Sequence, residues 1–169
     1  MSISRRSILL GGGAALGLAG VAVALRPMSP SVEAAEGSFE FILTDAEWQA
    51  RLSPEAYQVL RHEATERPFT SPLNEEKRAG TFHCAGCDLP LFASETKYDS
   101  GTGWPSFNDH LPGAIGTSED TSLFMVRTEV HCARCGGHQG HVFPDGPEPT
   151  GLRYCINGVA LKFVPAEAA

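Results

Sequence analysis

The chain has 169 residues, of which 42% are hydrophobic, and its 18 Gly and 12 Pro favour one domain of short strands and turns over a helical bundle. Three of its 13 basic residues and one of its 20 acidic residues lie in residues 1–34, so the remainder carries a net charge of −9. This acidic body excludes nucleic acid as a partner, because phosphate binding needs a basic surface.

Residues 1–34 have the pattern of an export signal. Arg5 and Arg6 precede an uncharged run rich in Gly and Ala, residues 8–25. Val32 and Ala34 then place small side chains at the two positions that a signal peptidase reads. The segment resembles a twin-arginine signal peptide, which predicts a periplasmic or other extracytoplasmic location and no stable membrane association after cleavage. The alternative is a retained membrane anchor, because the run is about as long as a bilayer span.

The next segments predict a tether and two short helices. We expect residues 35–43 to be the tether and residues 44–165 to be the domain. Residues 44–47, Thr-Asp-Ala-Glu, form a capping box that predicts a helix to about residue 52. Residues 53–55, Ser-Pro-Glu, start a second helix that ends near residue 64.

Beyond residue 80 the chain has the alternation of short strands. The predicted strands cover residues 80–83, 122–132, 140–143, 152–156 and 159–164. Asn157-Gly158, between the last two, predicts a tight hairpin. The predicted fold class is therefore mainly β with short N-terminal helices.

Four of the five cysteines form two Cys-x-x-Cys pairs, Cys84 with Cys87 and Cys132 with Cys135. Two such turns can supply a tetrahedral four-sulfur shell, which suits one structural zinc ion that joins two parts of the domain. Export makes two disulfides, or one redox-active pair, the alternatives. The doubled spacing favours zinc, and the histidine before each pair is interpreted as an ordinary strand residue.

Cys155 is the cysteine left over. On a strand, Arg153, Cys155 and Asn157 share one face, and a nearby cation lowers the pKa of a thiol. The alternative is a buried structural cysteine that packs as a small hydrophobic side chain. The pattern around Cys155 leaves both readings open.

Two histidines, His138 and His141, lie in a glycine-rich stretch between the second cysteine pair and Cys155. Histidine suits proton transfer near neutral pH, so the three residues have the composition of a Cys/His nucleophilic site. Metal ligation is the alternative, although four thiolates already complete a zinc shell. Trp104 and Phe107, in a Gly/Pro loop, either wall an apolar pocket or form a small core that fixes the loop.

These motifs together resemble a known family. They are Arg-Pro-Phe-Thr-Ser-Pro-Leu-Asn at residues 67–74, the two cysteine pairs, and the stretches at residues 103–107, 140–143 and 153–157. From about residue 41 to residue 164 the chain resembles the B-type methionine sulfoxide reductases, which act on the R epimer of the sulfoxide. The resemblance implies two antiparallel sheets with short N-terminal helices and a four-cysteine zinc site.

The resemblance also implies roles for individual residues. Cys155 matches the nucleophile that attacks the sulfoxide sulfur, His138 and His141 match the pair that positions and protonates the oxygen, and Asn157 matches a residue that organises the site. Trp104 and Phe143 match the pocket for the methyl group, with Arg153 among the substrate-binding residues. The implied partners are oxidised proteins or peptides and a thiol reductant, and we expect a monomer.

One position departs from the family. Many members reduce the sulfenic acid with a second cysteine before the tryptophan, and here Thr102 stands at that position. We therefore expect a thioredoxin-like protein or a small thiol to reduce Cys155 directly; the alternative is a cysteine of a metal-binding pair. Two other classes remain to be compared, a zinc-ribbon binding module without catalysis and a disulfide oxidoreductase.

Overall fold

The computed structural model describes residues 39–167. Helix α1 covers Asp45–Arg51 and helix α2 covers Pro54–His62, and both start at the predicted caps. Thr44 and Glu47 form the capping box, and the Ser53 side chain accepts a hydrogen bond from the Ala56 N–H. The predicted export signal, residues 1–34, lies outside the described residues. In residues 39–167 there is no helix that is long and apolar enough to cross a membrane.

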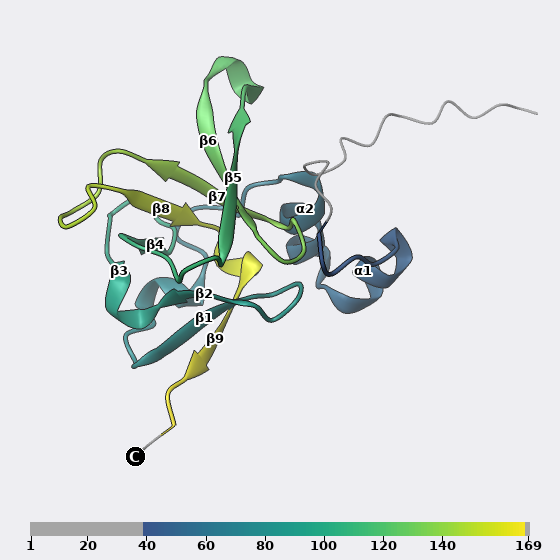
Figure 1. Ribbon diagram of the computed structural model, residues 1–169, viewed down its shortest axis with the longest axis horizontal. Coiled ribbons are helices and arrows are strands. Elements are labelled where there is room, and N and C mark those ends of the chain that lie inside the picture. The colour runs from purple at the N-terminus through teal and green to yellow at the C-terminus, as the bar shows by residue number, and fades with distance from the viewer. Residues whose placement is uncertain (1–38, 168–169) are drawn as a thin grey trace, which may run out of the picture. The chain divides into compact units, whose positions relative to one another are not determined.

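Two antiparallel sheets form the body (Figure 1). The three-stranded sheet has the order β2-β1-β9, with β1 at Gly80–Cys84, β2 at Pro90–Ala93 and β9 at Leu161–Pro165. The six-stranded sheet has the order β3-β4-β8-β7-β6-β5. Its strands are Lys97–Tyr98 (β3), Ser106–Phe107 (β4), Ile115–Asp120 (β5), Arg127–Cys132 (β6), His138–Phe143 (β7) and Arg153–Ile156 (β8). The mainly β fold with two sheets and short N-terminal helices is confirmed.

Aromatic side chains fill the core between the sheets. Phe82 of β1 and Phe92 of β2 pack against Phe107 of β4, with ring centroids 5.0 and 4.3 Å from Phe107. All three side chains are fully buried, and burial of each stabilises the fold by roughly 1.5–3 kcal/mol. Phe107 is therefore a core residue, in agreement with the interpretation that its loop is fixed by a small core.

The predicted hairpin at Asn157-Gly158 is wrong. Strand β8 belongs to the six-stranded sheet and β9 to the three-stranded sheet, and a short 3-10 helix, Gly158–Ala160, joins them. The Asn157 side chain accepts from the Glu66 N–H and donates to the Gln139 carbonyl, so tertiary contacts replace the local turn. The predicted strand at residues 122–132 begins only at Arg127, because Ser122–Phe124 form another 3-10 helix.

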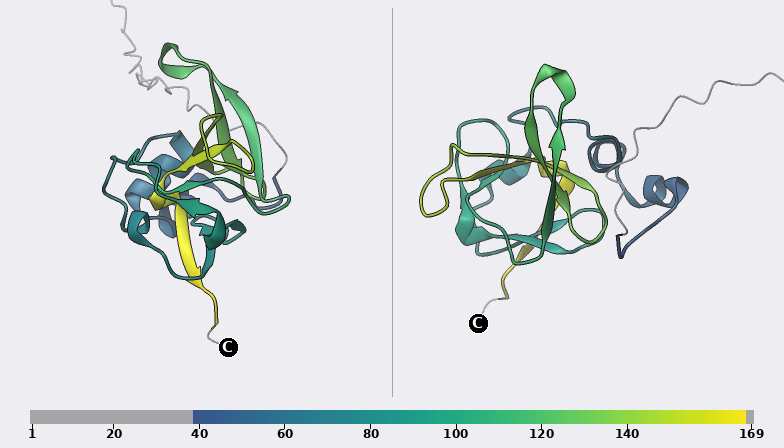
Figure 2. Two further views of the ribbon diagram at one scale, coloured as in Figure 1. Left: turned by 90° about the vertical axis from the view of Figure 1, so that its left-hand side faces the viewer. Right: turned by 45° about the horizontal axis from the view of Figure 1, so that its top comes forward.

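Strands β5 and β6 form a hairpin that projects beyond the rest of the six-stranded sheet (Figures 1 and 2). Six residue pairs hold it, from Ile115 opposite Cys132 to Asp120 opposite Arg127. The turn at residues 121–126 lies beyond this last pair.

Candidate active site and metal centre

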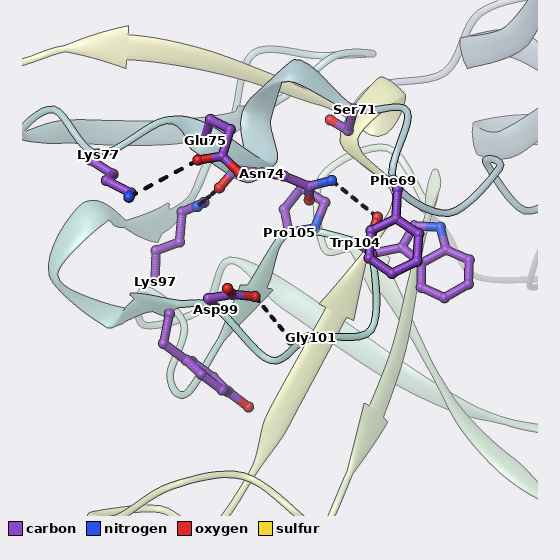
Figure 3. Close-up of a pocket in the computed structure, with 12 residues that line it drawn as sticks. Phe69, Ser71, Asn74, Glu75, Lys77, Lys97, Asp99, Gly101, Trp104 and Pro105 are labelled. Carbon is purple, nitrogen blue, oxygen red and sulfur yellow. Dashed lines mark hydrogen bonds and ion pairs between the residues drawn. The ribbon is translucent and has the colours of Figure 1, made fainter.

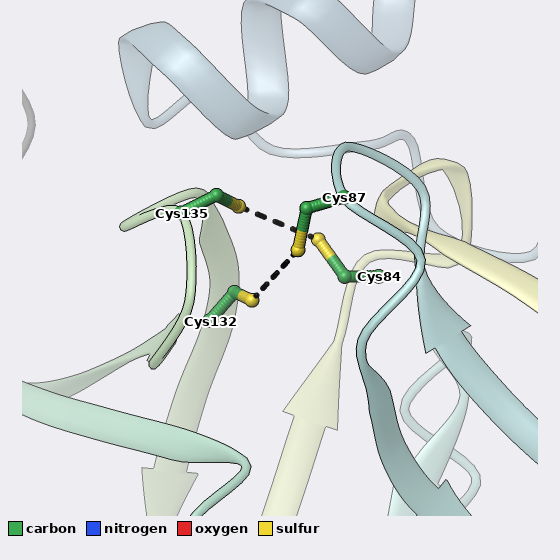
Figure 4. Close-up of side chains that lie close together, drawn as sticks. All are labelled: Cys84, Cys87, Cys132 and Cys135. Carbon is green, nitrogen blue, oxygen red and sulfur yellow. Dashed lines mark hydrogen bonds between the residues drawn. The ribbon is translucent and has the colours of Figure 1, made fainter. Parts of the chain in front are cut away.

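Four buried thiols meet where the two sheets approach each other. Cys84 ends β1 of the smaller sheet, and Cys132 ends β6 of the larger sheet. All four Sγ atoms lie within 4.8 Å of one another, with Cys84 3.7 Å from Cys135 and Cys87 3.5 Å from Cys132 (Figure 4). A tetrahedron with Zn–S bonds of about 2.3 Å has edges of about 3.8 Å. The cluster fits zinc, and all four of its cysteines are free thiols, not members of the two alternative disulfides.

Proton sharing within the cluster also fits a cation. Four thiolates within 4.8 Å of one another repel strongly, so these sulfurs do not ionise together without a metal. A divalent ion removes that conflict by replacing the shared protons. The cysteines would hold one zinc ion and so join the two sheets, as the sequence predicted.

Cations surround the backbone of both cysteine turns. Arg51 and Arg61, from the two N-terminal helices, donate to the carbonyls of Gly86 and Cys135 at 2.5 and 3.2 Å. Arg134 donates to the Cys87 carbonyl at 3.1 Å. Four thiolates and one divalent ion leave a net negative charge, which these guanidinium groups stabilise. The α-helices thus contribute to the metal centre.

Cys155 lies apart from this cluster, in the middle of the six-stranded sheet. It pairs with His141 of β7 on one side and with Ser106 of β4 on the other. Tyr154 and Ile156 point to the core, so the predicted alternation along this strand is confirmed. Cys155 borders a cavity of about 110 Å³, whose other lining residues are Thr65, Trp104, Arg127, Gly140, His141, Phe143 and Asn157.

Burial raises the pKa of the Cys155 thiol, although the Thr102 hydroxyl and the Arg153 charge both oppose this. Arg153 thus lowers the pKa of Cys155, as the sequence predicted, but burial has the larger effect. Arg153 makes two hydrogen bonds of 2.9 Å to Asp145 and stacks over the Phe143 ring at 4.4 Å. Arg153 is thus engaged by Asp145 and Phe143, and Phe143, not Arg153, is a wall residue of the cavity.

The two histidines occupy different positions at the site. His141 lines the cavity, whereas His138 lies behind it and is only 2% exposed. Their ring centroids are 5.4 Å apart. Gly140 between them permits this arrangement, because a Cβ there would lie 2.1 Å from the Cys155 carbonyl oxygen. His141 is therefore placed to touch a bound molecule, and His138 supports the site from inside.

Each histidine is held by a carboxylate that sequence reasoning missed. His138 Nδ1 donates to Glu129 at 2.7 Å, and His141 Nε2 donates to Asp120 at 2.7 Å. Burial opposes ionisation of both carboxyls, yet their hydrogen bonds hold the pKa of each well below its usual range. Both are therefore ionised acceptors that fix their histidine rings.

Burial lowers the pKa of His141, and the hydrogen bond to Asp120 opposes this effect. Strand periodicity could have revealed Glu129, because it shares a face with Arg127 and His131 on a predicted strand. Asp120 gave no such signal, since its strand was not predicted.

Asn157 links the cavity wall to the neighbouring segments. Its Oδ1 accepts from the Glu66 N–H at 2.8 Å, and the Glu66 carbonyl accepts from Trp104 Nε1 at 2.8 Å. Its Nδ2 donates to the Gln139 carbonyl at 3.0 Å. Asn157 thus fixes the position of Trp104 relative to β7, the strand that carries both histidines.

A larger cavity, of about 300 Å³, lies against another side of Trp104 (Figure 3). Two of its charged lining groups are already engaged: Lys97 donates to the Asn74 carbonyl at 2.8 Å, and Asp99 accepts from the Gly101 N–H. Neither a thiol nor an imidazole is among its lining residues. The small cavity at Cys155 is therefore the better candidate for a reacting site.

Comparisons with known proteins agree with this geometry. A family model described as the SelR domain matches residues 52–165. The chain belongs to this family. It is 62% identical over 124 residues to a peptide methionine sulfoxide reductase MsrB of Pseudomonas putida (strain W619), covering 73% of this chain and 93% of the relative.

Two more relatives carry the same name. The protein from Agrobacterium fabrum is 55% identical over 123 residues, which cover 72% of this chain and 91% of the relative. The protein from Leifsonia xyli subsp. xyli is 50% identical over 138 residues, which cover 80% of this chain and 99% of the relative.

Proposed function

We propose that this protein reduces the R epimer of methionine sulfoxide to methionine, with Cys155 as the attacking thiol. One observation carries the assignment of Cys155. It is the cysteine outside the metal cluster, and it lies opposite His141 at a small cavity walled by Trp104 and Phe143. Membership of the SelR family and the names of the relatives support the reaction.

The cavity walls explain how the substrate is held. Trp104 and Phe143 offer apolar surface to the methyl group on the sulfoxide sulfur, and the cavity is too small for more than the end of the side chain. The sulfur then faces Cys155, and the polar oxygen faces His141. This placement orients the oxygen towards the group that protonates it.

The reaction combines attack and proton transfer. The Cys155 thiolate forms a bond to the sulfoxide sulfur while His141 protonates the oxygen, which is a poor leaving group until it is protonated. Transfer of the oxygen to Cys155 releases methionine and leaves a sulfenic acid. The sulfoxide sulfur is reduced by two electrons, and the cysteine is oxidised by two electrons.

Two carboxylates and Arg127 hold the histidines in position for proton transfer. Ionised Asp120 stabilises protonated His141 and is itself paired with Arg127 at 2.5 Å. Ionised Glu129 fixes His138, which we propose helps to position the sulfoxide oxygen from behind the cavity. Asn157 keeps Trp104 and β7 together through Glu66.

We further propose that an external thiol reduces the sulfenic acid. Thr102 Oγ1 lies 3.8 Å from Cys155 Sγ, and a threonine cannot form a disulfide. Two thiol groups, from a thioredoxin-like protein or from small thiols, then regenerate Cys155 and yield a disulfide and water. The other cysteines lie in the zinc cluster, where oxidation would remove the metal.

The location and assembly of the protein belong to the proposal too. The Arg5-Arg6 motif and the uncharged run after it support twin-arginine export of a folded, metal-loaded domain to the periplasm or beyond. Residues 35–43 then tether a monomeric domain of residues 44–165. Such a domain would act on oxidised proteins or peptides of the cell envelope.

An assay with the two epimers separated tests the activity. Peptides that contain methionine R-sulfoxide or methionine S-sulfoxide are incubated with the protein and with either thioredoxin or a small dithiol, and methionine is measured. We expect methionine from the R epimer alone. Reduction of both epimers, or of the S epimer alone, would contradict the proposal.

A further inference from the structure

The turn of the β5–β6 hairpin carries a methionine of this chain. The sequence has three methionines, and two of them, Met1 and Met28, lie in the proposed export signal. Met125 is the third, and it belongs to the turn at residues 121–126, at the end of the hairpin that projects beyond the six-stranded sheet (Figures 1 and 2). Oxidation of methionine within residues 39–167 therefore has a single target, and this target lies outside the core.

Met125 is open to oxidants in solution. Its side chain is 50% exposed, and its neighbours Phe124 and Val126 are exposed as well. Its backbone is extended, with φ −125° and ψ 151°, and its N–H donates to the Ser122 carbonyl at 3.1 Å. A peroxide in solution can thus reach this thioether without any opening of the fold.

Oxidation at Met125 creates the group that the proposed function removes. Hydrogen peroxide transfers one oxygen to the thioether sulfur, so that an S–O bond forms, the O–O bond breaks and water leaves. The sulfur is oxidised by two electrons, and the peroxide is reduced by two electrons. Because an exposed thioether can be attacked at either lone pair, the R and S sulfoxides form in similar amounts.

The hairpin keeps Met125 away from the cavity of its own chain. The last residue pair of the hairpin is Asp120 with Arg127, and an ion pair of 2.5 Å joins their side chains. Asp120 also holds His141 at 2.7 Å, and Arg127 lines the cavity beside Cys155. Folding the turn back towards Cys155 would break this pair and release the histidine that the reaction needs.

A second copy of the chain does not meet this obstacle. The cavity of about 110 Å³ has room for the end of one side chain, and a projecting turn can supply such an end while it stays folded. The turn, Thr-Ser-Leu-Phe-Met-Val at residues 121–126, is uncharged. It therefore brings no carboxylate to the other copy, although the domain as a whole is acidic and two copies repel each other.

We propose that Met125 is a site of reversible oxidation and that Cys155 of a second copy reduces its R sulfoxide. This inference rests on the proposed function. The oxygen passes to Cys155 of the second copy as a sulfenic acid, which two external thiols then reduce with release of water and a disulfide. The S sulfoxide stays in place, so repair of Met125 stops at about half.

The test keeps the substrate and the catalyst on different chains. The Cys155→Ser chain cannot repair itself, so it is oxidised with hydrogen peroxide, treated with catalase, and used in large excess over the unaltered protein and a small dithiol. Trypsin then releases residues 98–127 as one peptide, because this stretch lies between Lys97 and Arg127 and has no other basic residue before its end. Fragmentation in the mass spectrometer distinguishes oxidation of Met125 from oxidation of Trp104.

The matched control is the Cys155→Ser chain with Met125→Leu, which keeps an apolar side chain of similar volume in the turn. We expect the Met125 sulfoxide to fall to about half and then stay constant, and a reductase specific for the S epimer to remove the remainder. The oxidised Cys155→Ser chain should also slow the reduction of a methionine R-sulfoxide peptide, because both compete for the cavity. The control chain, oxidised in the same way, should not slow it.

Other outcomes separate this inference from the proposed function. Reduction of the R-sulfoxide peptide without loss of the Met125 sulfoxide would overturn the inference alone, whereas failure to reduce either substrate would overturn the proposed function. With oxidised unaltered protein and dithiol, repair between copies requires the rate per chain to rise in proportion to protein concentration. A rate per chain that dilution does not change would place the repair within one chain and overturn the role of the second copy.

Discussion

The five cysteines of the chain lie in two unlike environments. Four are surrounded by one another, with all Sγ atoms within 4.8 Å, and cationic side chains bind the backbone around them. The fifth, Cys155, has a hydroxyl, a guanidinium group and an imidazole as neighbours and opens to a cavity. Sulfur surrounded by sulfur holds a metal, whereas sulfur beside a proton donor and an open cavity can react. The neighbouring groups, not the residue type, decide whether a cysteine of this chain binds a metal or reacts.

Replacement at Cys155 gives the largest expected effect. The Cys155→Ser variant should lose at least about a thousandfold in kcat/KM, because a serine hydroxyl is a poor nucleophile towards sulfur. Its zinc content and melting temperature should match those of the unaltered protein. Metal analysis, thermal unfolding and the R-sulfoxide assay measure these quantities. Full activity would place the chemistry elsewhere and would favour a zinc-binding module for this part of the chain.

Replacement of a cysteine within the cluster should lower zinc content and stability first, and activity only as a consequence. The Cys132→Ser variant should be purified with little zinc and should unfold about 10 °C or more below the unaltered protein, because the two sheets lose the ion that joins them. Activity lost here should follow the fraction of unfolded protein. A variant that keeps its stability and zinc content but loses activity would mean that Cys132 takes part in turnover.

The pKa shifts predict how rate depends on pH. Burial lowers the pKa of His141 and raises that of Cys155, while the reaction needs protonated His141 and the Cys155 thiolate. The fraction of enzyme molecules that carry both protonated His141 and the Cys155 thiolate is greatest between the two pKa values and falls on either side. A bell-shaped profile of kcat/KM is therefore expected, with His141 setting the acid limb and Cys155 the alkaline limb.

Loss of the carboxylate beside His141 should separate these limbs further. In Asp120→Asn the pKa of His141 falls, so the acid limb moves to lower pH and kcat/KM on the plateau drops about tenfold. The matched control is Asp88→Asn, because Asp88 pairs with Arg51 and Lys162 away from the cavity. An unmoved acid limb in Asp120→Asn would show that His141 is not the proton donor.

The Thr102 hydroxyl should have the smallest effect. Its hydrogen bond lowers the pKa of Cys155, so Thr102→Val should move the alkaline limb to higher pH and reduce kcat/KM about threefold. Thr102→Ser keeps the hydroxyl and serves as the control, with an unchanged profile expected. Equal pH profiles for the valine and serine variants would show that the Thr102 hydroxyl does not influence the pKa of Cys155.

Local signals in the sequence predicted much of the fold. The capping box at Thr44 and the Ser53-Pro54 start gave both helices, because helix caps are local hydrogen bonds. The Asn157-Gly158 hairpin was predicted by the same local logic and is wrong, because Asn157 bonds to Glu66 and Gln139, distant in the sequence. Strands β2 to β5 were also missed. Of these, β3 and β4 have two residues each, too few to show an alternation along the chain, and they form only through their pairing.

The candidate site was predicted in part. Paired spacing identified the metal ligands, since each Cys-x-x-Cys turn is local. Arg153 lowers the pKa of Cys155 as predicted, but burial has the larger effect, and the sequence shows neither that burial nor the pairing of Arg153 with Asp145. Asp120 acts across a strand pair that folding creates, so no spacing rule could find it.

A single turnover without reductant tests the central claim most directly. The protein is freed of reductant and mixed with excess methionine R-sulfoxide peptide, and sulfenic acid is trapped and located by mass spectrometry. We predict one methionine formed per chain, one oxygen retained as sulfenic acid on Cys155, and zinc still bound by the cluster. A disulfide that joins Cys155 to Cys84, Cys87, Cys132 or Cys135, with release of zinc, would contradict the separation of the two cysteine environments.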